Sequence, residues 1–481
     1  MNNISKLEPK CVFGFFDEIT RIPRVSQNEK NISDYLVKFA SDRGFIAYQD
    51  KLLNVTILKP ATEGMEDKNT VILQAHMDMV GAKKEGKDFD FGANPIEAYE
   101  EDGFVKAKGT TLGADDGIGM AMILALLDSK DASHPMLEAV FTVNEEVGLV
   151  GAAGYDYKKL KGKRLINIDS EEENHIVTGC AGGCTTSITS KCRKEKSEGI
   201  VYEVTISGLV GGHSGLNINE GRANANVIMG RLFARVRDVC ETALSEYEGG
   251  TLDNAICNLA KAELVVKKKN SDDFEKAVEE FYKDIRLEYC KTDPDLKIKV
   301  KNHGKSKKET VSAGDFDRIT GILASLTNGI YKYSQNIDGC VIASSNIGIV
   351  RVKPKQFSIN TFVRGNRDYL TRELVDKNRR IAEAFGAQMT DSGLMPAWEG
   401  VPDGDFAKQA ENIYRKLFPG RDIGVTTIHA GVECAYFCNN IKGLEAISLG
   451  PNLTGAHTVC ESLDVESTQR MWEFLKELVK C

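Results

Sequence analysis

Apolar positions along the chain form two kinds of pattern. Short runs rich in β-branched and large apolar residues predict strands, because such residues fit a pleated, buried surface. These runs lie at residues 54–58, 71–75, 137–143, 165–168 and 444–449. Apolar residues three and four positions apart predict amphipathic helices, as at Ile32, Leu36 and Phe39. The two patterns together predict an α/β fold in which helices cover a sheet.

The two ends of the first amphipathic helix are also predicted. Ser26 and Glu29 have the spacing of a capping box, in which each side chain accepts a hydrogen bond from a backbone N–H at the helix N-terminus. Gly44 follows the last apolar position and predicts the helix stop.

Acidic and histidine side chains stand at five strand ends or turns. They are His76, Asp115, the pair Glu145 and Glu146, Asp169 and His457. Any one of them could be an ordinary loop residue, and simple helix capping explains the neighbouring Asp116. Ligand sites in open α/β sheets gather beyond the carboxyl ends of the strands. We therefore expect the five positions to converge on one site.

The donor types at these positions indicate a metal. Two imidazoles and three carboxylates, with a fourth carboxylate left over, suit zinc or a similar divalent ion better than calcium, which prefers oxygen ligands throughout. Two metals could share one bridging carboxylate, each taking one histidine and one terminal carboxylate. Such a pair activates a water and polarises a carbonyl oxygen, and the spare glutamate is the expected general base.

Length and composition narrow the function class. A chain of 481 residues is expected to form two compact units, or one unit interrupted by another. The net charge of −8 argues against a nucleic-acid partner, and no phosphate-binding glycine motif is present. No apolar stretch is long enough to span a membrane, and the N-terminus lacks a signal-peptide core, so we expect a soluble, cytoplasmic protein. The twelve cysteines are interpreted as reduced thiols.

Five short motifs, in order along the chain, resemble those of the M20 family of two-zinc metallopeptidases. They are H-x-D at 76–78, GADDG at 113–117, NEEVG at 144–148, IDSEE at 168–172 and GAH at 455–457. The longer stretches TLGADDGIGMA and HAGVECA are most similar to the aminoacyl-histidine dipeptidase branch of the family. The resemblance implies a zinc-exopeptidase-like mixed sheet flanked by helices, with an inserted α+β lid domain.

The resemblance also implies roles for the clustered residues. His76, Asp115 and Asp169 would hold one zinc, and Asp115 would bridge to a second zinc held by Glu146 and His457. Mn²⁺ or Co²⁺ could substitute. Asp78 would orient the His76 imidazole, and Glu145 would be the general base. The family pattern further implies a cis peptide bond between Asp115 and Asp116.

The lid is expected at residues 188–392, between the two parts of the catalytic domain at 1–187 and 393–481. The charged segment 190–199 predicts a crossover into the lid. The strands and helices that follow resemble two copies of one half. His213, in a glycine-rich loop, would stabilise the oxyanion by analogy with the family, although a loop histidine is usually just solvated. A duplicated lid could supply it within one chain, whereas short-lid relatives borrow it across a homodimer.

Substrate contacts are expected in the lid and in one later loop. Asn254 and Arg364 match lid positions that contact substrate, and an arginine can grip a free carboxylate with two hydrogen bonds. The alternative for Arg364 is a surface salt bridge. In the loop TTIHAGVECAYF the resemblance implies contacts from His429, Gly431 and Glu433, although His429 could be an ordinary hydrogen-bonded loop histidine.

The predicted activity is therefore hydrolysis of unblocked dipeptides, Xaa-His and others, with no nucleic-acid or membrane partner. Two alternatives stay open. One is an N-acyl amino-acid deacylase, which would not need a free amine. The other is a catalytically silent relative that keeps the metal-binding scaffold, and the presence of Glu145 beside a full ligand set argues against it.

Overall fold

The computed structural model describes residues 4–335, 337–401 and 404–481. The chain folds into two compact units. Unit 1 comprises Met1–Cys180, Trp398–Thr427 and Val432–Cys481, and unit 2 comprises Ala181–Ala397 and Ile428–Gly431. Among the described residues, no helix combines the length and the apolar character needed to cross a membrane.

Unit 1 is built on an eight-stranded mixed sheet with the order β1-β2-β6-β3-β7-β19-β8-β18. Its strands are β1 (Ile46–Gln49), β2 (Val55–Lys59), β3 (Val71–His76), β6 (Leu137–Thr142), β7 (Arg164–Asn167), β8 (His175–Cys180), β18 (Gly424–Ile428) and β19 (Glu445–Ser448). The inner strands β6, β3, β7 and β19 run parallel to one another. Every residue of β3 and β6 is buried, as expected for strands covered on both faces.

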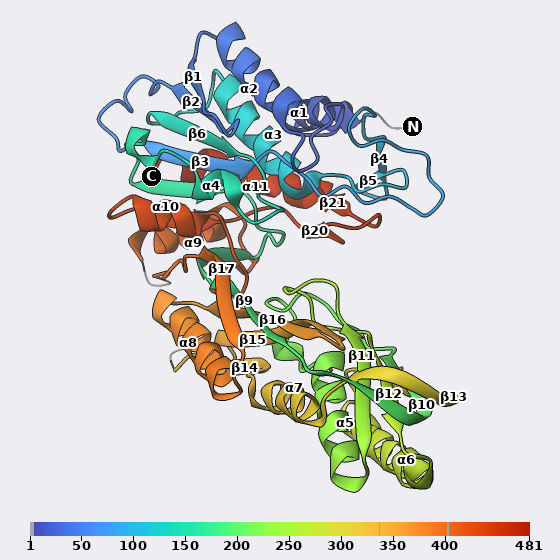
Figure 1. The fold of residues 1–481 in the computed structure, drawn as a ribbon. Helices are drawn as coiled ribbons and strands as arrows, with labels where there is room; N and C mark the ends of the chain where they lie inside the picture. The colour runs from blue at the N-terminus through green and yellow to red at the C-terminus, as the bar shows by residue number, and fades with distance from the viewer. Residues whose placement is uncertain (1–3, 336, 402–403) are drawn as a thin grey trace. The chain divides into compact units, whose positions relative to one another are not determined.

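Helices flank this sheet. They are α1 (Lys10–Thr20), α2 (Lys30–Asp42), α3 (Ala114–Asp128), α4 (Val150–Ala153), α9 (Asp405–Leu417), α10 (Cys434–Asn440) and α11 (Val465–Leu478), with short 3-10 turns η1 (Ile4–Lys6) and η2 (Tyr157–Lys159). The apolar helix α3 packs on β3 and against α1. In Figure 1 the red C-terminal elements lie among the blue and cyan N-terminal ones, because β19 pairs between β7 and β8.

A second, four-stranded sheet in unit 1 joins distant parts of the chain. Its strands are β4 (Ala98–Glu101), β5 (Phe104–Ala107), β20 (Leu453–Thr454) and β21 (Ser462–Asp464), in the order β20-β21-β5-β4. The strands β20 and β21 enclose the loop that carries His457. This sheet therefore anchors the His457 loop to the segment that leads into α3.

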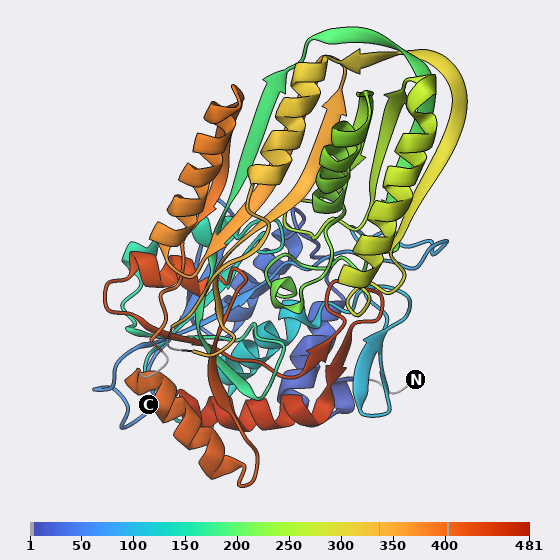
Figure 2. The same ribbon diagram turned by 90° about the horizontal axis from the view of Figure 1, so that it is seen from below.

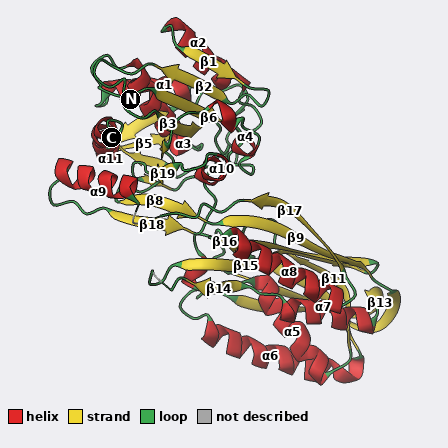
Figure 3. Cartoon of the chain, turned by 90° about the vertical axis from the view of Figure 1, so that its left-hand side faces the viewer, coloured by secondary structure: helices red, strands yellow, loops and turns green. Residues whose placement is uncertain are grey.

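Unit 2 is a nine-stranded sheet with helices on one face (Figures 2 and 3). Its strands are β9 (Gly182–Lys191), β10 (Lys194–Ser207), β11 (Thr242–Gly249), β12 (Ala260–Val266), β13 (Lys297–Val311), β14 (Gly329–Tyr333), β15 (Val341–Lys353), β16 (Gln356–Gly365) and β17 (Gln388–Met395). Its helices are α5 (Ala225–Val239), α6 (Ser271–Glu288), α7 (Ala313–Ser325) and α8 (Asp368–Ala384), with 3-10 turns η3 (Ile218–Glu220) and η4 (Lys268–Asn270).

The topology of unit 2 contains one pattern twice. The chain order β10-α5-β11-β12-α6-β13 is repeated as β9-α7-β15-β16-α8-β17, with the first copy inserted after β9 and β14 an addition at β15. The sheet order β13-β10-β12-β11-β15-β16-β9-β17 places each copy's strands in the sequence fourth-first-third-second, read inward from its own edge. The two copies meet where β11 pairs with β15. This symmetry agrees with the duplicated half expected from the sequence.

The crossover predicted at 190–199 is wrong. The segment lies in the ends of β9 and β10, and its charged residues are exposed except for the half-buried Glu195. β10 pairs with the lysine-rich β13, where Glu198 and Lys305 lie 2.7 Å apart. Charges that pair across an exposed two-stranded ribbon resemble a polar linker in sequence.

Candidate metal centre

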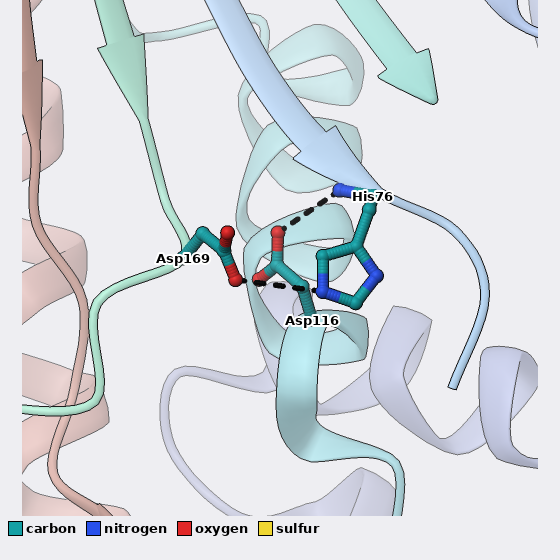
Figure 4. A group of neighbouring side chains, drawn as sticks. All are labelled: His76, Asp116 and Asp169. Carbon is teal, nitrogen blue, oxygen red and sulfur yellow. Dashed lines mark hydrogen bonds and ion pairs between the residues drawn. The ribbon is translucent and has the colours of Figure 1, made fainter. Parts of the chain in front are cut away.

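The predicted side chains of unit 1 converge because three neighbouring parallel strands end together. β3 ends at His76, β6 ends shortly before Glu145, and β7 ends shortly before Asp169. β3 lies between the other two and pairs with both. Figure 4 shows the side chains of His76 and Asp169 pointing toward each other, and the His76 Nε2 to Asp169 Oδ1 distance is 3.5 Å.

Asp115 lies between two histidines from distant parts of the chain. Its Oδ1 is 2.9 Å from His76 Nε2, and its Oδ2 is 2.9 Å from His457 Nε2. His457 Nε2 is also 3.0 Å from Glu146 Oε1. Each carboxylate oxygen of Asp115 thus faces a different imidazole, which is the arrangement expected of a carboxylate shared by two cations.

Three overlapping groups of donor atoms lie close enough to hold metal ions, with all atoms of a group within 4.8 Å of one another. The groups are His76, Asp116 and Asp169; His76, Glu145 and Glu146; and Asp115, Glu146 and His457. Every histidine and carboxylate predicted as a ligand appears in at least one group.

Asp116 differs from Asp115 in what its oxygens already bind. The peptide bond between the two is cis, which confirms the prediction. Asp116 Oδ2 accepts a hydrogen bond from the backbone N–H of His76 at 3.2 Å (Figure 4). Its Oδ1 accepts one from the backbone N–H of Gly119 at 3.2 Å. Asp116 therefore joins α3 to the end of β3, whereas Asp115 presents its carboxylate to the imidazoles.

Asp78 organises the strand end from behind. Its Oδ1 lies 3.4 Å from His76 Nδ1, the ring nitrogen that faces away from Asp115. The same carboxylate accepts hydrogen bonds from the backbone N–H groups of Glu145 at 3.0 Å and Glu146 at 3.3 Å. Burial raises the pKa of the Asp78 carboxyl, but its interactions with His76 and the Glu145 N–H outweigh burial and lower the pKa below its usual value.

The predicted capping box is wrong, and its two residues support the metal centre instead. The helix α2 begins at Lys30, and neither Ser26 nor Glu29 caps it with a side chain. The Ser26 hydroxyl donates to Asp78 Oδ2 at 2.8 Å. Glu29 Oε1 accepts from the backbone N–H groups of Gln27 and Asn144, each at 3.0 Å. Both side chains therefore form tertiary hydrogen bonds to residues that follow β3 and β6, rather than local bonds at the start of the helix.

Electrostatics in the cluster favour a cation. Burial raises the pKa of Glu145 well above its usual value, with further repulsion from Asp169 and Glu146. Burial also raises the pKa of Asp169 to about 6. Hydrogen bonds to Asp115 and Glu146 raise the pKa of His457 to about 11. Carboxylates that repel one another in a buried site are stabilised by a divalent ion, so the donor set fits a metal.

Glu433 lies beneath the cluster. Its side chain is fully buried, and Oε2 accepts hydrogen bonds from Gln74 Nε2 at 2.6 Å and Thr142 Oγ1 at 2.5 Å. Gln74 in turn accepts from Asn167 Nδ2 at 2.6 Å. Thr142 and Asn167 are the last residues of β6 and β7, and Gln74 lies just before the end of β3. Burial raises the pKa of Glu433 to about 7.

Unit 2 brings a second set of predicted residues together. His213 Nε2 lies 3.0 Å from an Arg364 terminal nitrogen, although the two are far apart in sequence. Arg364, at the end of β16, is buried, while His213 is half-buried. The backbone carbonyl of Asn254 accepts a hydrogen bond from Ser214, which fixes the two loops against each other.

His429 and the half-buried Gly431 belong to the short segment that returns to unit 2. His429 Nδ1 donates to Asn366 Oδ1 at 2.8 Å, and Nε2 accepts from Ser344 Oγ at 2.8 Å. Burial, with the nearby Arg364 and His213, lowers the pKa of His429 to about 3. The ring is therefore neutral and held on both sides, as the hydrogen-bonded alternative predicted.

Two buried charged residues in the metal centre escaped the sequence analysis. Arg24 is 1% exposed and Glu461 is 3% exposed, and both contact the turn that carries Asp115. Neither has a local sequence signal. The only hint is that Glu461 follows His457 by a few positions in the same loop.

The chain is similar to known peptidases over nearly its whole length. Residues 72–480 match the family described as Peptidase family M20/M25/M40. The chain is 34% identical over 482 residues to the cytosol non-specific dipeptidase of Escherichia coli (strain K12), covering 100% of this chain and 99% of that protein.

Solved structures give the same picture. The crystal structure of aminoacylhistidine dipeptidase from Vibrio alginolyticus superposes with a TM-score of 0.86 at 33% identity, covering 99% of this chain and 98% of that chain. Aminopeptidase PepT from Bacillus cereus ATCC 10987 shares the fold, with a TM-score of 0.54 at 16% identity over 98% of each chain.

Proposed function

Because the chain belongs to peptidase family M20/M25/M40, we propose that it hydrolyses the peptide bond of unblocked dipeptides, Xaa-His and others, with two divalent metal ions held in unit 1. One observation carries the proposal: the two carboxylate oxygens of Asp115 each lie 2.9 Å from the Nε2 of a different histidine. Zinc is the proposed metal because the donors combine imidazole nitrogen with carboxylate oxygen, and Mn²⁺ or Co²⁺ would also fit.

The proposed ligands divide into two sets. His76, Asp115 and Asp169 would hold one ion, and Asp115, Glu146 and His457 the other. When bound, the metal pair supplies Lewis acidity and a lowered pKa for the attacking water. Asp78 faces the far ring nitrogen of His76, where a carboxylate fixes the tautomer and raises the basicity of the ligand.

Glu145 is the proposed general base. Its carboxylate lies in the same donor group as His76 and Glu146 but is left over when the two ligand sets are filled. It would accept the proton of the attacking water and deliver it to the nitrogen of the leaving amine. A buried carboxyl with a raised pKa can hold that proton between the two steps.

Arg364 and His213 are the proposed substrate residues of unit 2. The Arg364 guanidinium would bind the free C-terminal carboxylate of a dipeptide, and His213 would donate to the oxyanion. Asn254, His429 and the Gly431 backbone would support these contacts, while we assign Glu433 to the layer beneath the strands. His213 Nε2 and an Arg364 terminal nitrogen lie 3.0 Å apart within unit 2, so we propose that the two residues act on the substrate together.

The proposal is tested with Glu145→Ala. We expect hydrolysis to fall by at least about 10³-fold because the proton acceptor is lost, while the bound metal stays near two ions per chain. Glu172→Ala is the matched control, because Glu172 is an exposed acid in the neighbouring IDSEE motif that pairs with His175 at 2.6 Å. Normal turnover by Glu145→Ala would show that Glu145 is not the base.

A substrate panel tests the activity itself. Wild-type protein loaded with zinc or manganese is offered Xaa-His, other dipeptides, tripeptides and acetyl-amino acids. Cleavage of unblocked dipeptides is expected. Preference for acetylated substrates would favour a deacylase, and no cleavage of any member would favour a silent relative.

A cytoplasmic location is proposed by analogy with the cytosol dipeptidase of Escherichia coli.

A further inference from the structure

A buried carboxylate holds the turn that carries Asp115. Glu461 Oε2 accepts hydrogen bonds from the backbone N–H groups of Leu112 at 2.7 Å and Gly113 at 3.0 Å. Its Oε1 accepts from Ala114 at 2.7 Å and Asp115 at 3.4 Å. Four consecutive N–H groups therefore converge on one side chain. Without this acceptor, N–H groups in a buried turn would lose their partner, which is costly in a folded protein.

A buried guanidinium holds the same turn from its carbonyl side. Arg24 donates to the backbone carbonyls of Met77 at 3.0 Å and Asp78 at 2.9 Å, and also to that of Gly113. The N–H of Gly113 thus donates to Glu461, and its carbonyl accepts from Arg24. A Cβ at Gly113 would lie 2.7 Å from an Arg24 terminal nitrogen, so this close approach requires glycine.

The two charged residues connect the Asp115 turn to different partners. Arg24 ties it to the residues just after β3, next to His76. Glu461 ties it to the loop of His457, which closes on itself through hydrogen bonds from Thr458 N–H to the Gly455 carbonyl and from Glu461 N–H to the Thr458 carbonyl. Asp115 is therefore joined to one histidine by Arg24 and to the other by Glu461.

We propose that Glu461 is a positioning residue that sets the spacing between Asp115 and His457, and thereby the affinity of the metal held by Asp115, Glu146 and His457. The other ion, at His76, Asp115 and Asp169, shares Asp115 but is also supported by the Arg24 connection, so it should depend less on Glu461. The inference rests on the proposed two-metal function. It assigns the two ions separate supports, so their affinities can be changed separately.

The chain provides a matched control for Glu461. Glu138, in β6, is also a buried carboxylate, at 1% exposure, that accepts backbone hydrogen bonds, from Lys161 and Gly162 at 3.0 Å. It lies near the start of β6, whereas Glu145 and Glu146 follow the other end of that strand. A substitution at Glu138 therefore reproduces the loss of a buried carboxylate without touching the metal centre.

The test is a titration of metal-free protein with Co²⁺, followed by visible absorption and calorimetry, on wild type, Glu461→Gln and Glu138→Gln. Wild type and Glu138→Gln are expected to bind two ions. In Glu461→Gln one of the two ions should be weakened at least about 10-fold more than the other, as for other residues that orient ligands.

Each other outcome contradicts a separate statement. Equal weakening of both ions in Glu461→Gln, or no weakening, would overturn the role of Glu461. Fewer than two ions in wild type would instead overturn the proposed function. If Glu461→Gln does not fold, Glu461→Asp replaces it, because a shorter carboxylate still accepts hydrogen bonds but reaches fewer N–H groups. The same selective loss is expected there, and its absence would overturn the proposal.

Discussion

The two clusters of polar side chains differ in the sign of the charge they gather. In unit 1, buried carboxylates crowd together, and the pKa values of Glu145 and Asp169 rise because burial and mutual repulsion disfavour their charge. In unit 2, His213 and His429 accompany Arg364, and the pKa of His429 falls to about 3 because burial and the neighbouring Arg364 disfavour a second positive charge. The first environment favours a cation and the second an anion. The proposed hydrolysis of dipeptides uses both.

Removing the metal should have the largest effect, because it removes what the unit 1 cluster is built to bind. Dialysis against a chelator is expected to abolish dipeptide hydrolysis, and Zn²⁺, Mn²⁺ or Co²⁺ should restore it. Activity and metal content are measured on the same samples. Full activity in protein that contains almost no metal would break the comparison.

Arg364 is the positive charge of the unit 2 cluster, and its substitution tests whether that cluster binds an anion. Arg364→Ala is expected to lower kcat/KM for dipeptides by about 10²- to 10³-fold, because the proposed charged partner of the substrate carboxylate is lost. Arg364→Lys should recover part of this, since lysine keeps the charge but not the two-pronged geometry. Metal content should not change. Arg379→Ala, at a half-buried arginine on α8 paired with Asp376 and Asp391, is the control. An Arg364→Ala enzyme of normal kcat/KM would place the carboxylate contact elsewhere.

Asp78 tests the support of the metal centre from behind. Asp78→Asn is expected to weaken metal binding by about 10- to 100-fold, because His76 loses the carboxylate that orients its ring. The affinity of the His76 ion is followed by Co²⁺ titration, with Ser26→Ala as a milder change to the same carboxylate, whose Ser26 contact is 2.8 Å. Wild-type affinity in Asp78→Asn would mean that Asp78 only closes the 145–146 turn.

The sequence identifies candidate metal ligands better than it identifies the residues that position them. His76, Glu145 and Asp169 could be found because each follows an apolar strand, and parallel neighbours end together. Ser26 and Glu29 have the spacing of a capping box, but they do not cap the helix that follows. Their side chains bind Asp78 and the backbone of Asn144 instead. Such side chains are read correctly only once the strand ends are placed.

The roles of Arg24 and Glu461 could not be assigned from the sequence, for a related reason. Their partners are backbone groups, which carry no residue-specific signal. Arg24 lies 89 positions from Gly113 in sequence, and Glu461 lies 349 positions from Leu112. The repeat in unit 2 was visible as order and spacing of elements, whereas the paired strands at 190–199 were hidden by their charge.

Glu433 and His429 lie in one loop, and burial shifts their pKa values in opposite directions, each against the charged form. Substitution of Glu433 is expected to have the smallest effect of those predicted. Burial raises the pKa of Glu433 to about 7, so the folded protein binds a proton there that the unfolded chain, with its ordinary glutamate pKa, releases near pH 4.5. The stabilisation is present below that pH and is lost as pH rises through 7.

Glu433→Gln removes this dependence, since glutamine keeps an oxygen to accept from Gln74 and Thr142 but does not ionise. Relative to wild type, the metal-free variant should gain about 1–3 kcal/mol of unfolding free energy between pH 5 and pH 8, measured by urea denaturation at both values. Glu66→Gln, at an exposed position, should show no such gain. A constant difference between Glu433→Gln and wild type would mean that the buried carboxyl does not change protonation over this range, and that the layer beneath the strands is already charged at pH 5.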